Sequence, residues 1–369
     1  MRSGILTSKS AGNSGPNSYT MKTVAPWYIS GAATTVDRKF YTNLQLGNGQ
    51  IIHGISVNTF SPTQNDYPLI YGGDVPAPGF NSSTSCDPTT IISKNYEEID
   101  LETPYIAPFS SRGPNKVTSD ILKPDIAAPG VDLLASWSPL SPISGVKGDL
   151  RLSIFNVVSG TSMACAHVTA AAVYLKSFHP GWSPAALKSA LMTTATPLNP
   201  ALNEDAEFAY GAGQINPWKA VYPGLVYDVG PNDYINFLCG QGYSAALLRI
   251  ITGDNNTCTS SANARSVFNL NLPSFALSTV KSQDKDVTFG RTVTNVGLAR
   301  STYRAIVSNY SSSLNIEVVP DVLTFTSLGQ RPSFTLRIQG TINADLVSFS
   351  LTWDDGTHQA RSPVVVYAP

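Results

Sequence analysis

Alternation of hydrophobic and polar residues is the clearest signal in the last hundred residues of the chain. Short alternating runs recur there about every ten residues, separated by turn residues such as Asp354-Asp355-Gly356. The runs cover residues 287–289, 303–307, 314–318, 323–325, 333–338, 348–353 and 364–366. About seven short strands in about 100 residues is typical of a β-sandwich. We therefore predict an all-β sandwich domain over residues 266–369.

In the first part of the chain, short apolar or alternating runs are separated by turn residues. Residues 40–46 and 51–57 both alternate and flank the turn sequence Gly47-Asn48-Gly49, so they predict a β-hairpin. Residues 61–103 are rich in proline, glycine, serine and threonine and have little regular pattern. A structureless loop of that length is unusual inside a compact domain, so this segment resembles a linker or the remains of an insertion.

Residues 154–195 predict one strand and two helices. The apolar run 154–158 predicts a buried strand, and the small residues from Ser162 to about Phe178 predict a helix. A second helix is predicted from Ser183-Pro184 to about Thr194, because serine is a good N-cap and proline fits the first helical position.

Composition excludes several functional classes. Charged residues make up 13% of the 369 residues and the net charge is −1, so the chain lacks the basic footprint of a nucleic-acid-binding protein. The 42% content of hydrophobic residues argues against intrinsic disorder. No uncharged apolar run reaches the roughly 18 residues that a membrane-spanning helix needs. We expect no nucleic-acid partner and no membrane partner.

The surface composition is nevertheless that of an extracellular protein. Serine, threonine, asparagine and glycine are abundant, and three glycosylation sequons begin at Asn81, Asn255 and Asn309. Chance occurrence is the alternative, because the residues of the sequon are common here. The first residues contain no apolar segment typical of a signal peptide. This mismatch leads us to expect that an N-terminal part is missing.

The segment Val158-Ser159-Gly160-Thr161-Ser162-Met163-Ala164 contains a candidate nucleophile. Ser162 follows a strand and a glycine and stands at the start of a predicted helix. A helix N-terminus supplies unpaired amide donors and a partial positive charge, which would stabilise an oxyanion formed beside this serine. From this segment alone, a helix-capping role for Ser162 remains the alternative.

Other segments, taken in order, resemble those of subtilisin-like serine proteases, and most closely the plant, cucumisin-like subtilases. The segments that carry the resemblance are residues 10–16 (SAGNSGP), 109–114 (FSSRGP), 123–130 (KPDIAAPG), 160–168 (GTSMACAHV), 182–195 (WSPAALKSALMTTA), 211–213, 216–217 and 223–228. The resemblance covers nearly the whole chain. It implies an incomplete three-layer α/β/α core with a parallel sheet, followed by a fibronectin type III-like sandwich.

The resemblance also implies an activity and its residues. It implies a serine endopeptidase that hydrolyses peptide or protein substrates through an acyl-enzyme, with Ser162 as the nucleophile and Asn13 completing the oxyanion hole. The partial peptidase domain would cover residues 1–60 and 104–265. Residues 61–103 would be the remnant of a protease-associated insert. The family context implies secretion to the apoplast, and we expect no cofactor and no metal.

The chain departs from the family in its catalytic triad. The family places the triad Asp and His before the motif of Asn13, and this chain has only twelve residues there, with neither motif. His167 is five positions after Ser162, roughly 140° around a helix, so it cannot accept the serine proton. The other histidines, His53, His179 and His358, are not convincing bases either. We therefore predict a truncated serine endopeptidase that is inactive as this chain alone. The alternative is a catalytically inactive fragment or pseudoenzyme with a binding role through the C-terminal sandwich.

Further residues are assigned structural roles. Asp125 and Arg112 belong to family segments and are expected to be structural rather than catalytic. We predict a disulfide between Cys239 and Cys258 in an oxidising compartment, with two reduced thiols as the alternative. Cys165 is predicted to be a buried free thiol, and Cys86 to have lost its partner. No histidine and cysteine residues have zinc-site spacing.

Overall fold

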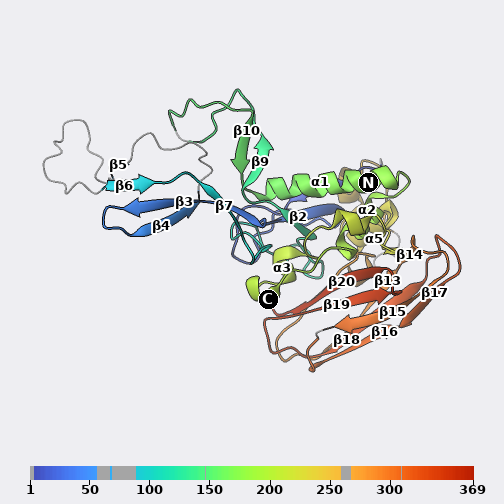
Figure 1. The fold of residues 1–369 in the computed structure, drawn as a ribbon. Helices are drawn as coiled ribbons and strands as arrows, with labels where there is room; N and C mark the ends of the chain where they lie inside the picture. Colours follow the sequence, from blue (N-terminus) through green and yellow to red (C-terminus); the bar gives the residue numbers. More distant parts are fainter. Residues whose placement is uncertain (1–3, 56–66, 69–88, 146, 259–266, 309) are drawn as a thin grey trace. The chain divides into compact units, whose positions relative to one another are not determined.

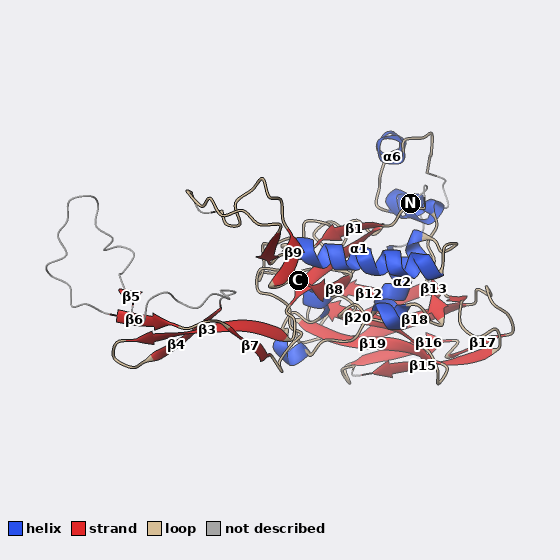
Figure 2. Ribbon diagram, turned by 45° about the horizontal axis from the view of Figure 1, so that its top comes forward, coloured by secondary structure: helices blue, strands red, loops and turns tan. Residues whose placement is uncertain are grey.

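The computed structural model describes residues 4–55, 67–68, 89–145, 147–258, 267–308 and 310–369. Contacts divide the chain into two compact units, and Figures 1 and 2 trace their elements. The first unit contains residues 1–35, 104–133 and 158–369, and the second unit contains residues 36–103 and 134–157. The domain limits expected from the sequence stay a prediction, because the two units are defined by contacts between residues and do not test limits drawn from sequence patterns.

A parallel sheet forms the centre of the first unit. Its strands are β1 (Thr7–Ser10), β2 (Tyr28–Thr34) and β8 (Ile126–Pro129), in the order β1-β2-β8. Six of the seven residues of β2 are buried, as expected for a parallel strand that is covered on both faces. Ile29 and Ala33 belong to the main hydrophobic cluster on one face, and Ala32 belongs to a second cluster on the other.

Helices cover both faces of this sheet. Helix α1 (Thr161–Phe178) packs on β1, β2 and β8, and helix α2 (Pro184–Thr193) packs on α1. On the other face, Ala209 and Tyr210 of α3 (Glu207–Tyr210) pack with Ala32. Gly31 allows the close approach of α1, because a Cβ there would lie 3.2 Å from Cγ2 of Val168. The predicted α/β class with a parallel sheet is therefore confirmed.

Shorter elements follow α2 and lead to the sandwich. They are η1 (Pro200–Leu202), α3, α4 (Pro217–Ala220), β11 (Leu225–Val226), α5 (Pro231–Gly240), α6 (Ala245–Thr252) and η2 (Val267–Asn269). Strand β11 pairs antiparallel with β14 (Thr294–Asn295), which already belongs to the C-terminal region. Within the described residues, no helix has the length and apolar character needed to cross a bilayer.

The C-terminal region is an all-β sandwich, as the alternating pattern predicts. One sheet has the order β12-β20-β19-β15-β17 and the other has the order β13-β18-β16. The strands are β12 (Phe275–Ser278), β13 (Lys285–Thr292), β15 (Ser301–Ser308), β16 (Leu314–Val319), β17 (Val322–Phe325), β18 (Ser333–Gly340), β19 (Leu346–Asp354) and β20 (Gln359–Tyr367). Trp353 and Tyr303 are fully buried in the shared core of the two sheets. Asp354-Asp355-Gly356 lies in the turn between β19 and β20.

The sandwich and the α/β core form many contacts inside the first unit. The Arg361 guanidinium donates to the carbonyl of Ala212 at 2.9 Å, and the Tyr367 hydroxyl donates to the carbonyl of Ser119 at 3.0 Å. The ring of Tyr367 also packs edge-on against Phe208. These contacts explain why the two regions belong to one compact unit.

The second unit contains the predicted hairpin, extended by further strands. Strand β3 (Arg38–Leu46) pairs antiparallel with β4 (Ile51–Ile55), β6 (Thr89–Ile92) and β7 (Tyr96–Ile99), and β5 (Tyr67–Pro68) pairs with β6. Residues 89–99 are therefore not structureless, which corrects the loop-like interpretation of 61–103. They form strands because β3 offers them an open edge for backbone pairing.

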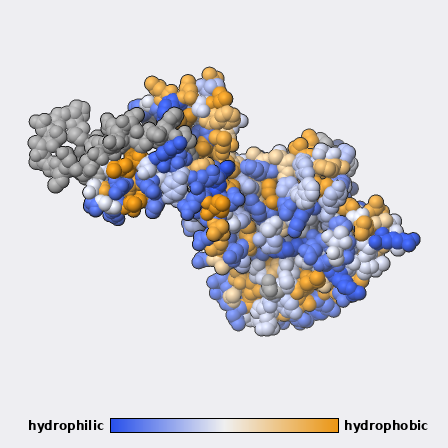
Figure 3. All heavy atoms as spheres, in the orientation of Figure 1, coloured by the Kyte–Doolittle hydropathy of each residue, from blue (hydrophilic) through white to orange (hydrophobic). Residues whose placement is uncertain are grey.

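A second hairpin, β9 (Leu133–Ser136) with β10 (Phe155–Val158), corrects the prediction of a buried strand at 154–158. Ile154 is 62% exposed and Phe155 is 51% exposed. Hydrophobic residues gather on this part of the surface in Figure 3. In the segment between the two strands, Leu140 is 93% exposed. An apolar run indicates a strand, but it does not indicate what covers that strand.

Candidate active site

Ser162 is the second residue of α1 and lies on the protein surface. The residue before the helix, Gly160, donates its N–H to the carbonyl of Gly130 at 2.8 Å. The Ser162 side chain is exposed, and its hydroxyl has no hydrogen bond to any described residue. The hydroxyl is therefore accessible to a substrate.

Glycine at position 130 holds the turn before Ser162 against the sheet. Gly130 follows β8, and a Cβ there would lie 2.5 Å from the Cβ of Ala33 and 3.0 Å from the carbonyl oxygen of Gly160. Any larger residue would push β2 and the turn apart. The end of β8 thus fixes where α1, and with it Ser162, begins.

Asn13 reaches the same helix end from a distant part of the sequence. Its Oδ1 accepts hydrogen bonds from the Thr161 N–H at 3.0 Å and from the Thr161 hydroxyl at 2.7 Å. The Thr161 hydroxyl oxygen accepts from the Gly12 N–H at 3.2 Å, and Thr161 is 1% exposed. These bonds fix the side-chain carbonyl of Asn13, so its Nδ2 is left as the free end, beside Gly160.

The loop that carries Asn13 is itself anchored. The Ser14 N–H donates to Oγ of Ser111 at 3.1 Å, and the Gly15 N–H donates to the carbonyl of Phe109 at 2.8 Å. Residues 109–114 thus hold the loop that carries Asn13 in place. Arg112 has the structural role expected of it, because it bonds to the carbonyls of Ser110 and Ala107 and to Asp205.

Two hydrogen-bond donors remain unused at this helix end. The Nδ2 group of Asn13 and the N–H of Ser162 have no acceptor among the described residues. The first N–H groups of a helix have no partner within it, and they favour negative charge. Donors placed in this way beside a serine hydroxyl can stabilise the oxyanion formed when the serine attacks a carbonyl.

No histidine is bonded to Ser162 in the described structure, and three have other partners. His167 Nδ1 lies 3.0 Å from the carbonyl of Met163, one turn earlier on α1. His179 Nε2 lies 2.7 Å from the carbonyl of Val221, and His358 Nδ1 lies 3.2 Å from Oδ2 of Asp355. The fourth, His53, is an exposed residue of β4 in the second unit. The described residues therefore place no general base against Ser162.

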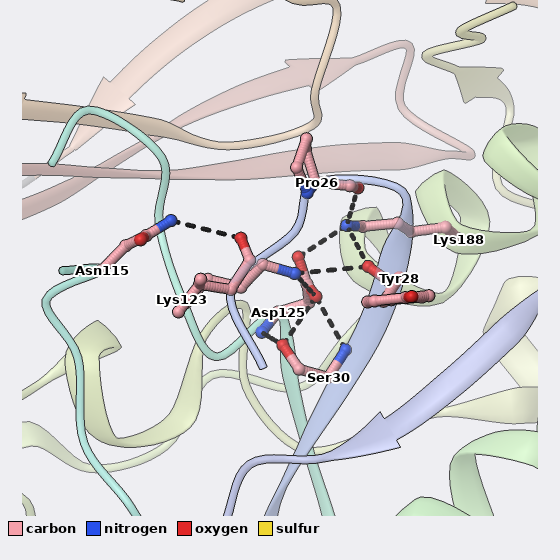
Figure 4. Close-up of polar contacts among 8 residues, drawn as sticks. Pro26, Tyr28, Ser30, Asn115, Lys123, Asp125 and Lys188 are labelled. Carbon is pink, nitrogen blue, oxygen red and sulfur yellow. Dashed lines mark hydrogen bonds and ion pairs between the residues drawn. The ribbon is translucent and has the colours of Figure 1, made fainter. Parts of the chain in front are cut away.

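Asp125 lies instead in a buried cluster of charges, shown in Figure 4. Its Oδ2 accepts from Nζ of Lys123 at 2.5 Å, and its Oδ1 lies 2.7 Å from Nζ of Lys188. The N–H and the hydroxyl of Ser30 also donate to Oδ2, at 2.7 and 2.8 Å. Both ammonium groups donate in addition to the carbonyl of Tyr28. With its oxygens occupied in this way, Asp125 has a structural role.

Burial and charge act in opposite directions in this cluster. Burial lowers the pKa of Lys123 to about 7, although the carboxylate of Asp125 favours the charged ammonium. Burial alone would raise the pKa of Asp125, but the charges of Lys123 and Lys188 outweigh it and hold that pKa below its ordinary value. Sequence reasoning missed Lys188 and Ser30. The only signal was a lysine within the apolar helix sequence AALKSALM.

Cys239, Cys258 and the three sequons lie far from Ser162 in the sequence, whereas Cys165 is three positions after it on α1. Cys239 and Cys258 are joined by a disulfide that links the end of α5 to the segment after α6. Cys165 is a free thiol but is only half-buried, which corrects the expectation of full burial. Asn255 is exposed. Asn81, Asn309 and Cys86 lie outside the described residues. Within the described part of the chain, no group of three or more His, Cys, Asp or Glu side chains could hold a metal ion.

Comparison with known proteins identifies the family. The subtilase family model matches residues 1–213, and a fibronectin type-III domain model matches residues 269–366. The chain belongs to the subtilase family. It is 43% identical to the subtilisin-like proteases SBT4.10 and SBT4.8 of Arabidopsis thaliana, and 38% identical to SBT4.3 of the same plant. All of this chain aligns with each, but it spans only 57%, 59% and 60% of their lengths.

Proposed function

We propose that this subtilase carries the nucleophile and the oxyanion hole of a serine endopeptidase acting on peptide or protein substrates. The observation that carries the proposal is the fixed side chain of Asn13. Two hydrogen bonds from Thr161 hold the side-chain carbonyl of Asn13. The amide nitrogen of Asn13 is therefore free at the N-terminus of α1, where Ser162 lies. Attack by Ser162 on a peptide carbonyl would form an oxyanion, which the Asn13 amide and the Ser162 N–H would stabilise before the acyl-enzyme forms.

The 369-residue chain by itself is proposed to be inactive toward peptides. A serine hydroxyl is a weak nucleophile unless a base takes its proton, and the described residues place no imidazole against Ser162. The other bonds of His167, His179 and His358 support this inactivity. The alternative is a non-catalytic protein that binds through its sandwich. Secretion to the apoplast and glycosylation at Asn255 belong to the same proposal.

A fluorophosphonate probe tests both parts of the proposal. We expect slow labelling of Ser162 in the 369-residue chain, and faster labelling when imidazole is added as a soluble base. Asn13→Ala should slow this labelling. The loss of one oxyanion-hole donor, as measured in a subtilisin, costs roughly 10²–10³ in kcat, so an effect of at least tenfold is expected. Ser162→Ala should abolish labelling, and Ser177→Ala, an exposed serine of the same helix, should leave it unchanged.

Two results would contradict this assignment. Fast, stoichiometric labelling without imidazole would show that the chain contains its own base. Labelling that is equally fast in the Asn13→Ala variant would remove Asn13 from the oxyanion hole.

A further inference from the structure

A cleft with two exposed aromatic rings lies within the first unit, far in the sequence from Ser162. It is formed by the residues that follow α2, by α4 and the residues after it, and by the turn between β19 and β20. Its volume is about 650 Å³. Small-molecule sites typically measure roughly 300–1,000 Å³, so the cleft is large enough for a ligand.

Trp218 and Tyr222 give this cleft flat apolar walls. Trp218 is 80% exposed and Tyr222 is 69% exposed, and they are four positions apart. Aromatic rings that remain in water on a folded protein mark binding surfaces, because they offer a large apolar area together with a polar group. A ligand with flat C–H faces would cover these rings.

The charged groups of the cleft are already paired within the protein. The carboxylate of Asp354 accepts hydrogen bonds from a backbone N–H and a side-chain amide of its own turn. Arg361 donates to the carbonyl of Ala212, and the ring of His358 is bonded to the carboxylate of Asp355. A charged ligand would have to compete with these bonds.

Some threonine hydroxyls, in contrast, have no partner among the described residues, although that of Thr194 donates to the carbonyl of Ala190. Oγ1 of Thr193 is buried and has no hydrogen bond, although Thr193 is only 1% exposed. A buried polar atom without a partner is energetically unfavourable. The hydroxyls of Thr196 and Thr357 and the ammonium of Lys219 have no partner among the described residues either. The cleft thus offers mostly neutral hydrogen-bonding groups beside two aromatic rings.

We propose that this cleft binds a neutral glycan. The C–H faces of its sugar rings stack on Trp218 and Tyr222. Its hydroxyls bond to the exposed hydroxyls of Thr196 and Thr357 and to Lys219. A neutral polyol matches the unpaired groups better than an anion does, because a single unpaired cation, Lys219, is available among the lining residues. It also matches them better than a peptide, since the free groups are hydroxyls rather than the backbone pairs that an extended peptide needs.

Binding of defined oligosaccharides to the 369-residue chain tests this proposal. The probes are hexasaccharides of β-1,3-glucose, β-1,4-glucose, β-1,4-xylose and β-1,4-mannose, with polygalacturonate and a casein digest as the acidic and the peptide alternatives. Tryptophan fluorescence and titration calorimetry measure Kd. We expect at least one neutral hexasaccharide to bind, and Trp218→Ala to weaken it at least tenfold. Trp218→Phe should retain most of the affinity, and Thr357→Val, which removes an exposed hydroxyl of the cleft, should lose several-fold.

A matched control uses another exposed aromatic residue. Phe178→Ala, on α1 and 50% exposed, should leave Kd unchanged. The proposal is overturned if no neutral hexasaccharide binds, or if Trp218→Ala has no effect on binding. Salt-sensitive binding of polygalacturonate alone, or displacement of the sugar by casein peptides, would assign the cleft to an anion or to a protein instead. None of these results depends on the chemistry of Ser162.

Discussion

Replacing Asp125 by asparagine should strongly destabilise the α/β core while leaving the sandwich folded. The substitution keeps the size of the side chain but removes the negative charge between Lys123 and Lys188, both of which are at most 2% exposed. The two buried lysines would then have no counter-ion, so one of them must give up its proton or remain charged without a partner. Breaking a buried ion pair in this way typically costs roughly 3–5 kcal/mol.

Hydrogen exchange can locate that cost. A tenfold change in protection corresponds to about 1.4 kcal/mol, so protection of β2, β8 and α2 should fall by roughly two to three and a half powers of ten. Peptides from β16 and β18, in the other sheet of the sandwich, serve as an internal reference. The matched control is Asp286→Asn, which removes an exposed carboxylate 2.6 Å from Arg337 and should leave protection of the core unchanged, because an exposed ion pair contributes little to stability. Core protection within threefold of the original would refute the reasoning.

Three further variants test other parts of the fold. Folding lowers the pKa of Lys123 to about 7, so above that pH the unfolded chain binds more protons than the folded chain. The free energy of unfolding of the core, measured with urea, should therefore rise between pH 7 and 9 by up to about 1.4 kcal/mol per pH unit. The same slope in the Lys123→Met variant would contradict this. Removing the disulfide with Cys239→Ala and Cys258→Ala should cost roughly 3 kcal/mol, seen as a lower Tm, whereas an equal Tm for oxidised and reduced protein would argue against it. Trp353→Ala, at a fully buried position, should destabilise the sandwich by roughly 3–5 kcal/mol in thermal melting; a loss below about 1 kcal/mol would be inconsistent with its packing.

The sandwich was predictable from sequence because alternation is a local signal. Strands β13 and β15 to β20 all fall on the alternating runs. Strand β12 was missed because Phe275, Ala276 and Leu277 are all buried, which removes the alternation. The start of α2 was likewise predictable, since Ser183 caps it by accepting from the Ala186 N–H at 3.0 Å.

The candidate site was predictable only in part. The residues Ser162 and Asn13 came from family segments, but the bonds through Thr161 join positions 148 residues apart, and no local pattern reports such a contact. The cluster around Asp125 was equally hidden. A lysine inside a helix is normally a surface residue. Only the fold shows that Lys188 contacts the carboxylate of Asp125, the residue just before β8.

The buried charges and the active site are connected through the register of β8. In the observed register Gly31 of β2 pairs with Ile126, and Thr34 pairs with Pro129. A slip of one residue would turn the carboxylate of Asp125 to the opposite face of the sheet, away from both lysines. The same slip would remove Gly130 from Gly160, whose N–H it accepts at 2.8 Å. The ion cluster therefore selects the one register in which the turn before Ser162 is held beside Asn13, a specificity role that can offset the energetic cost of burying the charges.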